Sequence, residues 1–376
     1  MRNPPDARAL QALVDRHGSP LLVIDCDVIR RQYHALAAAL PGVDLHYALK
    51  PLPDATAVRV LAGEGAWFDL ATNGEVDLVR DAGIPPGRCI HTHPIKRDSD
   101  IRHALDYGVT TFVVDNPDEI DKFVAYRERA CLLLRIAFRS PEAIVDLSRK
   151  FGCEVQAALE LAGRATRSGI RLLGLSFHVG SQVADPAMYV TAIEACGEII
   201  AAAAAKGIGP PQVLDIGGGF PIDYLQPAPR IDEFCRPIRA ALAKLPATLR
   251  VIAEPGRFIC GPAGISLATV MGRARRDGRW WYYLDDGIYG TFSGQLYDHS
   301  RFPIEPLHPR AGPRLPCVIA GPTCDSIDVV AEDMPMPELA IGDVVVARQI
   351  GAYTSATATD FNFFPRARIV HVHVES

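Results

Sequence analysis

The stretch VDLHYALKPLPDATAVRVLAGEGAWFDL, residues 43–70, holds one complete copy of the unit that repeats through most of this chain. It begins with an apolar run at 43–49, continues through a polar turn into an amphipathic segment of helical period, and reaches Gly65 before a second apolar run. Glycine suits the left-handed conformation that often ends a helix. The pattern therefore predicts a strand, a helix and a second strand in close succession.

The same unit recurs as far as Gly256, so that apolar runs of strand length alternate with amphipathic segments. Several of these runs are apolar throughout, which is typical of strands buried on both faces of a parallel sheet. We therefore expect a (β/α)8 barrel of the TIM type over residues 28–264, with an open doubly wound sheet as the second possibility. The expected strands span 43–49, 67–72, 89–93, 111–115, 131–137, 172–179, 212–216 and 250–254.

Beyond Glu254 the pattern changes, because the apolar runs are no longer separated by long helical segments. A further run at 21–24 precedes the first repeat and is positioned to join the same sheet as these later runs. We expect a second, mainly β domain built from residues 1–27 together with 265–376. Its later strands are expected at 265–270, 280–284, 317–320, 344–347 and 369–374.

The composition limits the class of partner. A formal net charge of −5 gives no electrostatic reason to expect nucleic acid or an anionic membrane, so a small molecule is the expected partner. No apolar run approaches roughly 20 residues and the first residues do not resemble a signal peptide, so we expect a cytoplasmic protein. The nine cysteines are scattered without a CxxC pair, which indicates neither a disulfide framework nor a metal site.

The loops after the last two expected barrel strands carry groups that suit an anion. Three successive glycines at 217–219 leave backbone N–H groups unobstructed, and Arg257 follows the eighth strand. In barrels of this kind the active site lies at the C-terminal ends of the strands, and phosphate is often bound by these two loops. The first strand ends at Lys50, whose amine can form a Schiff base with an aldehyde cofactor such as pyridoxal phosphate.

Eight short motifs, each weak alone, occur in order over nearly the whole chain. They are YALK (47–50), FDLA (68–71) with Glu75, KFG (150–152), HVGS (178–181), GGG (217–219), EPGR (254–257), GPTCD (321–325) and GAYT (351–354). Together they resemble the ornithine decarboxylase branch of the alanine-racemase-fold (fold type III) pyridoxal-phosphate enzymes. The resemblance implies a cofactor-binding barrel, a mainly β second domain, pyridoxal 5'-phosphate as the cofactor and no metal.

The resemblance also implies a role for each matching position. Lys50 would form the Schiff base, His178 would stack on the cofactor ring, and Glu254 would pair with the pyridine nitrogen. A carboxylate there favours the protonated ring, which is the electron sink for the carbanion left when CO2 departs. Cys324 matches the cysteine that returns a proton to Cα. Further cofactor-binding positions are Asp69, Glu75, Arg135, Ser181, Gly217, Gly218, Gly219, Arg257 and Tyr353.

A basic L-amino acid is the substrate that the resemblance implies. Asp286 and Asp325 match positions that face its distal amine, which a carboxylate binds by charge-assisted hydrogen bonds, and Tyr289 and Phe361 match residues that line the substrate pocket. Conversion of L-ornithine to putrescine and CO2, for polyamine biosynthesis, is the first expectation. Lysine, giving cadaverine, is the second, because one methylene typically changes discrimination by only about 1–3 kcal/mol. Aspartate rather than glutamate at position 325 argues against diaminopimelate.

Family members place the loop at 324–325 in the active site of the neighbouring subunit, so the resemblance implies a homodimer with shared sites. Three alternatives remain open. One is a relative that acts on lysine or on an amino acid attached to a biosynthetic intermediate. Another is a regulatory protein descended from such an enzyme, although Lys50, Glu254 and Cys324 are all present here. The third is a racemase of the same fold, which commonly has arginine where Glu254 stands.

Overall fold

The computed structural model describes residues 2–138, 149–208 and 211–375. The chain divides into two compact units. The barrel unit comprises Gln32–Pro221 and Ala228–Phe258, and the β unit comprises the segment up to Arg31, Ile222–Pro227 and the segment from Ile259 onward.

Eight parallel strands close the barrel in the order in which they occur along the chain, and β2 pairs with β9 to complete the ring. The predicted (β/α)8 barrel is therefore confirmed, and the open doubly wound sheet is wrong. The strands are β2 (Val43–Ala48), β3 (Trp67–Leu70), β4 (Cys89–His91), β5 (Thr111–Val114), β6 (Cys131–Ile136), β7 (Arg171–Phe177), β8 (Val213–Asp215) and β9 (Arg250–Ala253).

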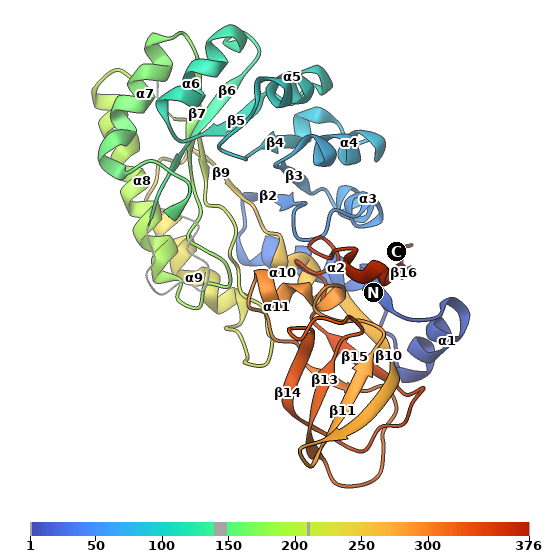
Figure 1. Ribbon diagram of the computed structural model, residues 1–376. Coiled ribbons are helices and arrows are strands. Elements are labelled where there is room, and N and C mark those ends of the chain that lie inside the picture. Colours follow the sequence, from blue (N-terminus) through green and yellow to red (C-terminus); the bar gives the residue numbers. More distant parts are fainter. Residues whose placement is uncertain (1, 139–148, 209–210, 376) are drawn as a thin grey trace. The chain divides into compact units, whose positions relative to one another are not determined.

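Helices follow the barrel strands and lie outside them (Figure 1). One of them, α8, is 19 residues long with a mean hydropathy of 1.4, which is long and apolar enough to cross a membrane by length and composition alone. The expectation that no run approaches that length is therefore wrong. Its buried side chains recur at helical spacing from Tyr189 to Ala203, as in a helix that packs on a barrel. The barrel helices are α3 (Ala55–Gly63), α4 (Asn73–Asp81), α5 (Asp98–Tyr107), α6 (Pro117–Lys122), α7 (Ala158–Arg167), α8 (Ala187–Ala205) and α9 (Ile231–Leu242).

The inside of the barrel has two layers of different chemistry. The apolar layer is formed by one buried side chain from each of five strands: Ile90, Val113, Leu133, Val213 and Ile252. Because side chains alternate between the two faces of a strand, the residue two positions further along each strand points the same way. These five positions are all polar, and we call them the rim layer: Thr92, Asp115, Arg135, Asp215 and Glu254. The barrel therefore has an apolar interior below a polar C-terminal end.

The β unit is built on a sheet with the strand order β12-β15-β10-β11-β13-β14. Strand β1 pairs antiparallel with β10 and parallel with β16, so the segment at 21–24 does join this sheet, as predicted. The sequence did not predict β12, β14 or α1, whose Leu10 packs into the core of this unit. The strands are β1 (Leu21–Asp25), β10 (Gly264–Arg276), β11 (Arg279–Leu284), β12 (Ile304–Pro306), β13 (Leu315–Ala320), β14 (Val329–Met336), β15 (Val344–Arg348) and β16 (Arg368–Val372). The remaining helices are α1 (Ala7–His17), α2 (Cys26–Ala39), α10 (Arg257–Cys260) and α11 (Gly294–Tyr297).

Candidate active site

An ion pair between Lys50 and Asp69 lies at the C-terminal end of the barrel. The Nζ atom of Lys50 is 3.1 Å from Oδ2 of Asp69, whose side chain is 1% exposed, whereas that of Lys50 is 39% exposed. The main chain also joins the two strand ends, because the N–H of Leu49 donates to the carbonyl of Asp69. The amine is therefore held by a buried carboxylate and still reaches solvent, which suits a group that must react with a small molecule.

Two carboxyl groups of the rim layer lie at the C-terminal ends of the neighbouring strands β8 and β9. Asp215 accepts the N–H of Gly217 at 2.9 Å, and burial raises the pKa of Asp215 to about 6. Burial, together with the nearby carboxylates of Asp215 and Asp69, raises the pKa of Glu254 well above its ordinary value. Each carboxylate therefore disfavours ionisation of the other. A positively charged ring nitrogen beside Glu254 would favour its ionised form.

His178 follows β7 and is neutral in this setting. Burial and the positive charges of Arg135 and Lys50 lower the pKa of His178 well below its ordinary value. Its Nδ1 atom accepts the N–H of Gly180 at 3.1 Å, so Nε2 carries the single ring proton. A neutral imidazole of fixed tautomer can lie against an aromatic ring without the cost of burying a charge.

The glycines at 217–219 form a narrow backbone cradle after β8. A Cβ atom on Gly218 would lie 2.5 Å from the carbonyl oxygen of Glu254, and one on Gly219 would lie 2.3 Å from that of Gly180. Arg257 is buried and donates to the hydroxyl of Ser181 at 3.0 Å. A backbone that no side chain obstructs, with a guanidinium and a hydroxyl close by, is suited to a phosphate group.

These residues fit pyridoxal phosphate, the cofactor that the sequence implies. Lys50 offers the amine for its aldehyde, Glu254 a carboxyl for its ring nitrogen, and the glycine cradle with Arg257 a site for its phosphate. The fit rests on chemistry that this barrel itself presents: a buried carboxyl pair whose pKa values are raised, a half-exposed amine, and a cradle that a Cβ atom would fill.

Two further residues that were predicted to bind the cofactor, Glu75 and Arg135, contact other parts of the protein. The Oε2 atom of Glu75 accepts the backbone N–H groups of Ala71 and Thr72 at 2.5 and 3.2 Å, so Glu75 completes a capping box at the start of α4. The guanidinium of Arg135 belongs to the rim layer and lies 5.6 Å from the ring centroid of Phe151. A direct contact of either residue with the cofactor stays a prediction.

The predicted substrate residues lie in the β unit, and three of them form one cluster. The hydroxyl of Tyr289 donates to Oδ2 of Asp325 at 2.5 Å, and its ring stacks on that of Phe361 with 4.6 Å between the ring centroids. Asp325 is half-buried, so its carboxylate is held by the tyrosine and is still partly open to a ligand. A partly accessible carboxylate beside a stacked pair of aromatic rings is suited to an ammonium group.

Asp328, which the sequence analysis did not single out, organises this cluster. Its Oδ2 atom accepts the backbone N–H and the hydroxyl of Thr323, and its Oδ1 atom accepts the N–H of Ile288. The loop that carries Cys324 is thereby fixed to the loop that carries Tyr289. Cys324 itself is exposed, and its N–H donates to Oδ1 of Asn362 at 3.1 Å.

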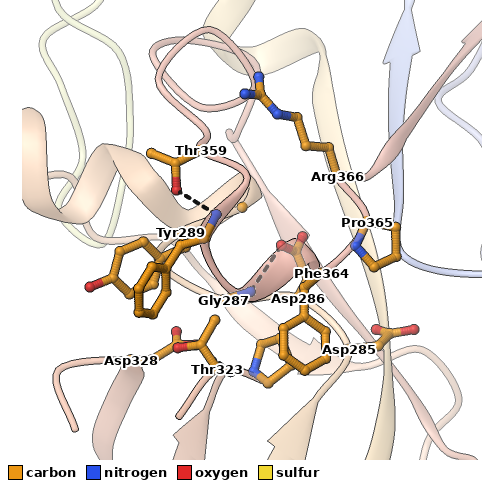
Figure 2. A pocket seen from close by; sticks show the side chains of 13 residues that line it. Asp285, Asp286, Gly287, Tyr289, Thr323, Asp328, Thr359, Phe364, Pro365 and Arg366 are labelled. Atoms are coloured by element: carbon orange, nitrogen blue, oxygen red, sulfur yellow. Dashed lines mark hydrogen bonds between the residues drawn. The ribbon is translucent and has the colours of Figure 1, made fainter. Parts of the chain in front are cut away.

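Asp286 is buried in the wall of a small pocket in the β unit (Figure 2). Its Oδ1 atom accepts the N–H groups of Gly287 and Thr291, both at 2.9 Å, and thus shapes the turn before Thr291. Burial raises the pKa of Asp286 to about 6. The pocket offers about 20 Å³, room for about one water-sized group. Contact of Asp286 with the distal amine of a substrate stays a prediction.

Two polar residues at the C-terminal end of the barrel, Thr92 and Asp215, were not predicted as site residues from the sequence. Thr92 and Asp215 both belong to the rim layer, and the signal that identifies them is their spacing of two from apolar barrel residues. Tyr353 is half-buried in the β unit, with a positive φ of 56°. Its role beside the phosphate stays a prediction.

Comparisons with known proteins agree with this chemistry. A sequence model described as the pyridoxal binding domain of pyridoxal-dependent decarboxylases matches residues 26–261. The chain is 52% identical to a lysine/ornithine decarboxylase from Vibrio vulnificus, solved with putrescine, with a TM-score of 0.94 over 98% of each chain. It is 53% identical to a lysine/ornithine decarboxylase structure from the same organism, solved with cadaverine, with a TM-score of 0.94 over 97% of this chain and 98% of that one. A lysine/ornithine decarboxylase from Selenomonas ruminantium is 37% identical, over 95% of this chain and 90% of its own length.

Proposed function

Since the chain belongs to the pyridoxal-dependent decarboxylases that act on ornithine and lysine, we propose that L-ornithine is its first substrate and L-lysine its second. The chain is an enzyme that removes CO2 from a basic amino acid with pyridoxal phosphate as cofactor. When bound, this cofactor supplies the ring that takes up the electron pair left at Cα. The observation that carries the proposal is the half-exposed Lys50 amine beside buried Asp69, at the same barrel end as the glycine cradle.

The barrel residues prepare this chemistry. Asp69 orients the amine of Lys50, and the carboxyl of Glu254 holds a proton at the ring nitrogen. Arg257 and the N–H groups of Gly218 and Gly219 would bind the phosphate, while the N–H of Gly217 donates to Asp215. Neutral His178 would lie against the ring of the bound cofactor. Each of these groups acts before any bond breaks, so the barrel contributes a prearranged environment.

We assign substrate recognition to the β unit. Asp325 would bind the distal ammonium of the amino acid, and Tyr289 would keep the carboxylate in place. Ornithine and lysine differ by one methylene, which an aspartate on a surface loop discriminates only weakly. Ornithine is preferred on this proposal, and turnover of lysine is expected at a lower rate.

Cys324 would return the proton. After CO2 has left, its exposed thiol gives a proton to Cα of the substrate, and the resulting thiolate regains one from solvent. The product is then a diamine, putrescine from ornithine or cadaverine from lysine. We also propose that Asp286 and Phe361 line the substrate pocket and that Tyr353 binds the phosphate.

We further propose a homodimer in which each site uses groups from both subunits. Exposed apolar side chains surround the loop of Cys324, among them Ile327 at 53% and Phe363 at 94% exposure, and burial of such residues in an interface is favourable. If sites are shared, a mixture of Lys50→Ala and Cys324→Ala chains forms mixed dimers with one intact site. About a quarter of the wild-type activity should then return.

The substrate is tested by incubating the full chain and cofactor with L-ornithine, L-lysine or L-arginine and identifying the diamine by mass spectrometry. Putrescine should form fastest, and Lys50→Ala should form none. Faster cadaverine formation would reverse the proposed preference. Absence of any diamine, with cofactor still trapped on Lys50 by borohydride, would point to an amino acid attached to a larger intermediate.

We propose residues 28–264 as the cofactor domain.

We also propose that the enzyme works in the cytoplasm. Its proposed substrate and cofactor are free small molecules, which supports this location. Cell fractionation with an antibody to the chain tests it, and recovery of the chain with a membrane or exported fraction would overturn it.

A further inference from the structure

Thr92 lies in the rim layer beside the carboxylate that holds Lys50. Its hydroxyl donates to Oδ1 of Asp69, while Oδ2 of the same carboxylate accepts from the Nζ atom of Lys50 at 3.1 Å. Asp69 is 2% exposed, so its oxygens depend on donors from the protein. We propose that Thr92 is a positioning residue: its hydroxyl fixes the Asp69 carboxylate so that the second oxygen faces the reactive amine.

The main chain around Thr92 is itself held firmly. Its N–H donates to the carbonyl of Leu70 at 2.8 Å, which continues the β3–β4 pairing one residue beyond the end of β4. The buried ammonium of Lys96 then ties down the next turn by donating to the carbonyls of His93 and Pro94 at 2.9 and 3.0 Å. A hydroxyl on such a fixed backbone can orient its partner more precisely than one on a free loop.

The hydroxyl becomes more important when Lys50 reacts. A free ammonium has three protons to donate, but a lysine nitrogen joined to an aldehyde carbon keeps at most one. Asp69 would then lose much of what its Oδ2 atom accepts, whereas the hydroxyl of Thr92 is unchanged by that reaction. A buried carboxylate left without donors is costly, so the hydroxyl of Thr92 keeps the Asp69 carboxylate hydrogen-bonded and aligned in the loaded enzyme.

The other charged or titratable side chains that act electrostatically on Asp69 do not replace this bond. Two are positive, Lys50 and Arg135, and three are carboxyls. Buried histidines at 46 and 91 are neutral, because burial lowers the pKa of each to about 4. The three carboxyls are those of Glu75, Asp215 and Glu254.

Two substitutions separate the hydroxyl from the shape of the side chain. Thr92→Val has nearly the same shape and no donor, and Thr92→Ser keeps the donor and loses a methyl group. Thr191→Val is the matched control, because that hydroxyl donates to the carbonyl of Ala187 on the exposed side of α8. Should Thr92→Val fail to fold, Thr92→Ala removes the hydroxyl with less crowding and is compared with Thr92→Ser in the same way.

The holoenzyme gives two readouts that need no amino acid. One is the rate at which pyridoxal phosphate leaves the full chain after dilution, and the other is the pH titration of the visible band of the lysine-bound cofactor. We expect Thr92→Val to release the cofactor roughly 10-fold faster, since a hydrogen bond to a charged group is lost. The midpoint of the titration should fall by roughly one pH unit, because the protonated lysine nitrogen has a less stable carboxylate beside it. Thr92→Ser should restore both values.

Two results would overturn the proposal. Release and titration that are unchanged in Thr92→Val would show that the hydroxyl does not position Asp69. A Thr92→Ser enzyme as impaired as Thr92→Val would assign the effect to the lost methyl group. The proposal depends on one part of the proposed function, the attachment of pyridoxal phosphate to Lys50. If no basic amino acid loses CO2, the substrate assignment fails while these two readouts still decide the role of Thr92.

Discussion

The hydroxyl of Tyr289 donates a 2.5 Å hydrogen bond to the carboxylate of Asp325, the group to which we assign the distal amine of the substrate. The bond has consequences for both partners. It lowers the pKa of Asp325 and raises the pKa of Tyr289 to about 12. The bond therefore favours the ionised form of Asp325, which is the form that binds an ammonium group, and the direction of the carboxylate is set before the substrate arrives.

Replacing Tyr289 by phenylalanine should weaken substrate binding more than the chemical step. Tyr289→Phe keeps the stacking on Phe361 and removes the donor to Asp325, so the KM for ornithine should rise by roughly 3- to 10-fold. Steady-state CO2 release checks this. The control is Tyr126→Phe, which breaks a similar bond of 2.6 Å to Asp98 on the barrel unit. An unchanged KM in Tyr289→Phe would remove Asp325 from substrate recognition.

A methyl group at Gly218 should interfere with cofactor binding. In Gly218→Ala the new Cβ atom would lie 2.5 Å from the carbonyl oxygen of Glu254 and 3.3 Å from Nε2 of His178. Either the cradle or the neighbouring strand must shift, so retention of pyridoxal phosphate should fall at least 10-fold. Equilibrium dialysis measures this. Gly272→Ala, where nothing lies within 4 Å of the added atom, should bind as the wild type does.

Neutralising Glu254 should slow the chemistry and spare cofactor attachment. Glu254→Gln removes the carboxyl that favours a protonated ring nitrogen, so kcat should fall roughly 100-fold, the order seen when one preorganised electrostatic group is lost. Lys50 is unaltered, so borohydride should still fix the cofactor to it. Glu233→Gln, at an exposed position of α9, is the control. A Glu254→Gln enzyme with wild-type kcat would contradict the assignment.

Asp286 should give the protein a pH-dependent instability. Burial raises its pKa from 3.8 to about 6, so between these values the folded chain binds a proton that the unfolded chain does not. The free energy of unfolding therefore falls as pH rises from 4 to 6, by up to about 3 kcal/mol. In Asp286→Asn the free energy of unfolding should not show this decrease, because asparagine does not titrate.

The difference in unfolding free energy, variant minus wild type, should accordingly increase between pH 4 and pH 7. Chemical denaturation at several pH values measures it. Asp277→Asn, in the turn between β10 and β11, provides the comparison and should show no such trend. A constant difference for Asp286→Asn would mean that the pKa of Asp286 is the same in the folded and the unfolded chain.

The sequence by itself determined the barrel, most of the β strands and the chemistry of the site. Strand and helix periods are local patterns, and each repeat from 43 to 256 carries both, so the order of elements can be read directly. Lys50 and the glycines at 217–219 stand just after predicted strands, and Glu254 is the last residue of one. Barrel topology brings these separate segments to one end. The domain limits at 28 and 264 stay a prediction.

Only the tertiary structure decided which polar side chains meet. Thr92 joins Asp69 because β3 and β4 pair in one register, and a strand's register depends on partners far away in the chain. The same holds for the coupling of Asp215 with Glu254 across β8 and β9. Glu75 and Asp286 also accept hydrogen bonds from backbone N–H groups. The residue type alone does not show whether a carboxylate accepts from the backbone or binds a ligand. Local patterns fix the elements, whereas hydrogen-bond partners and pKa values depend on distances between segments that a linear sequence does not contain.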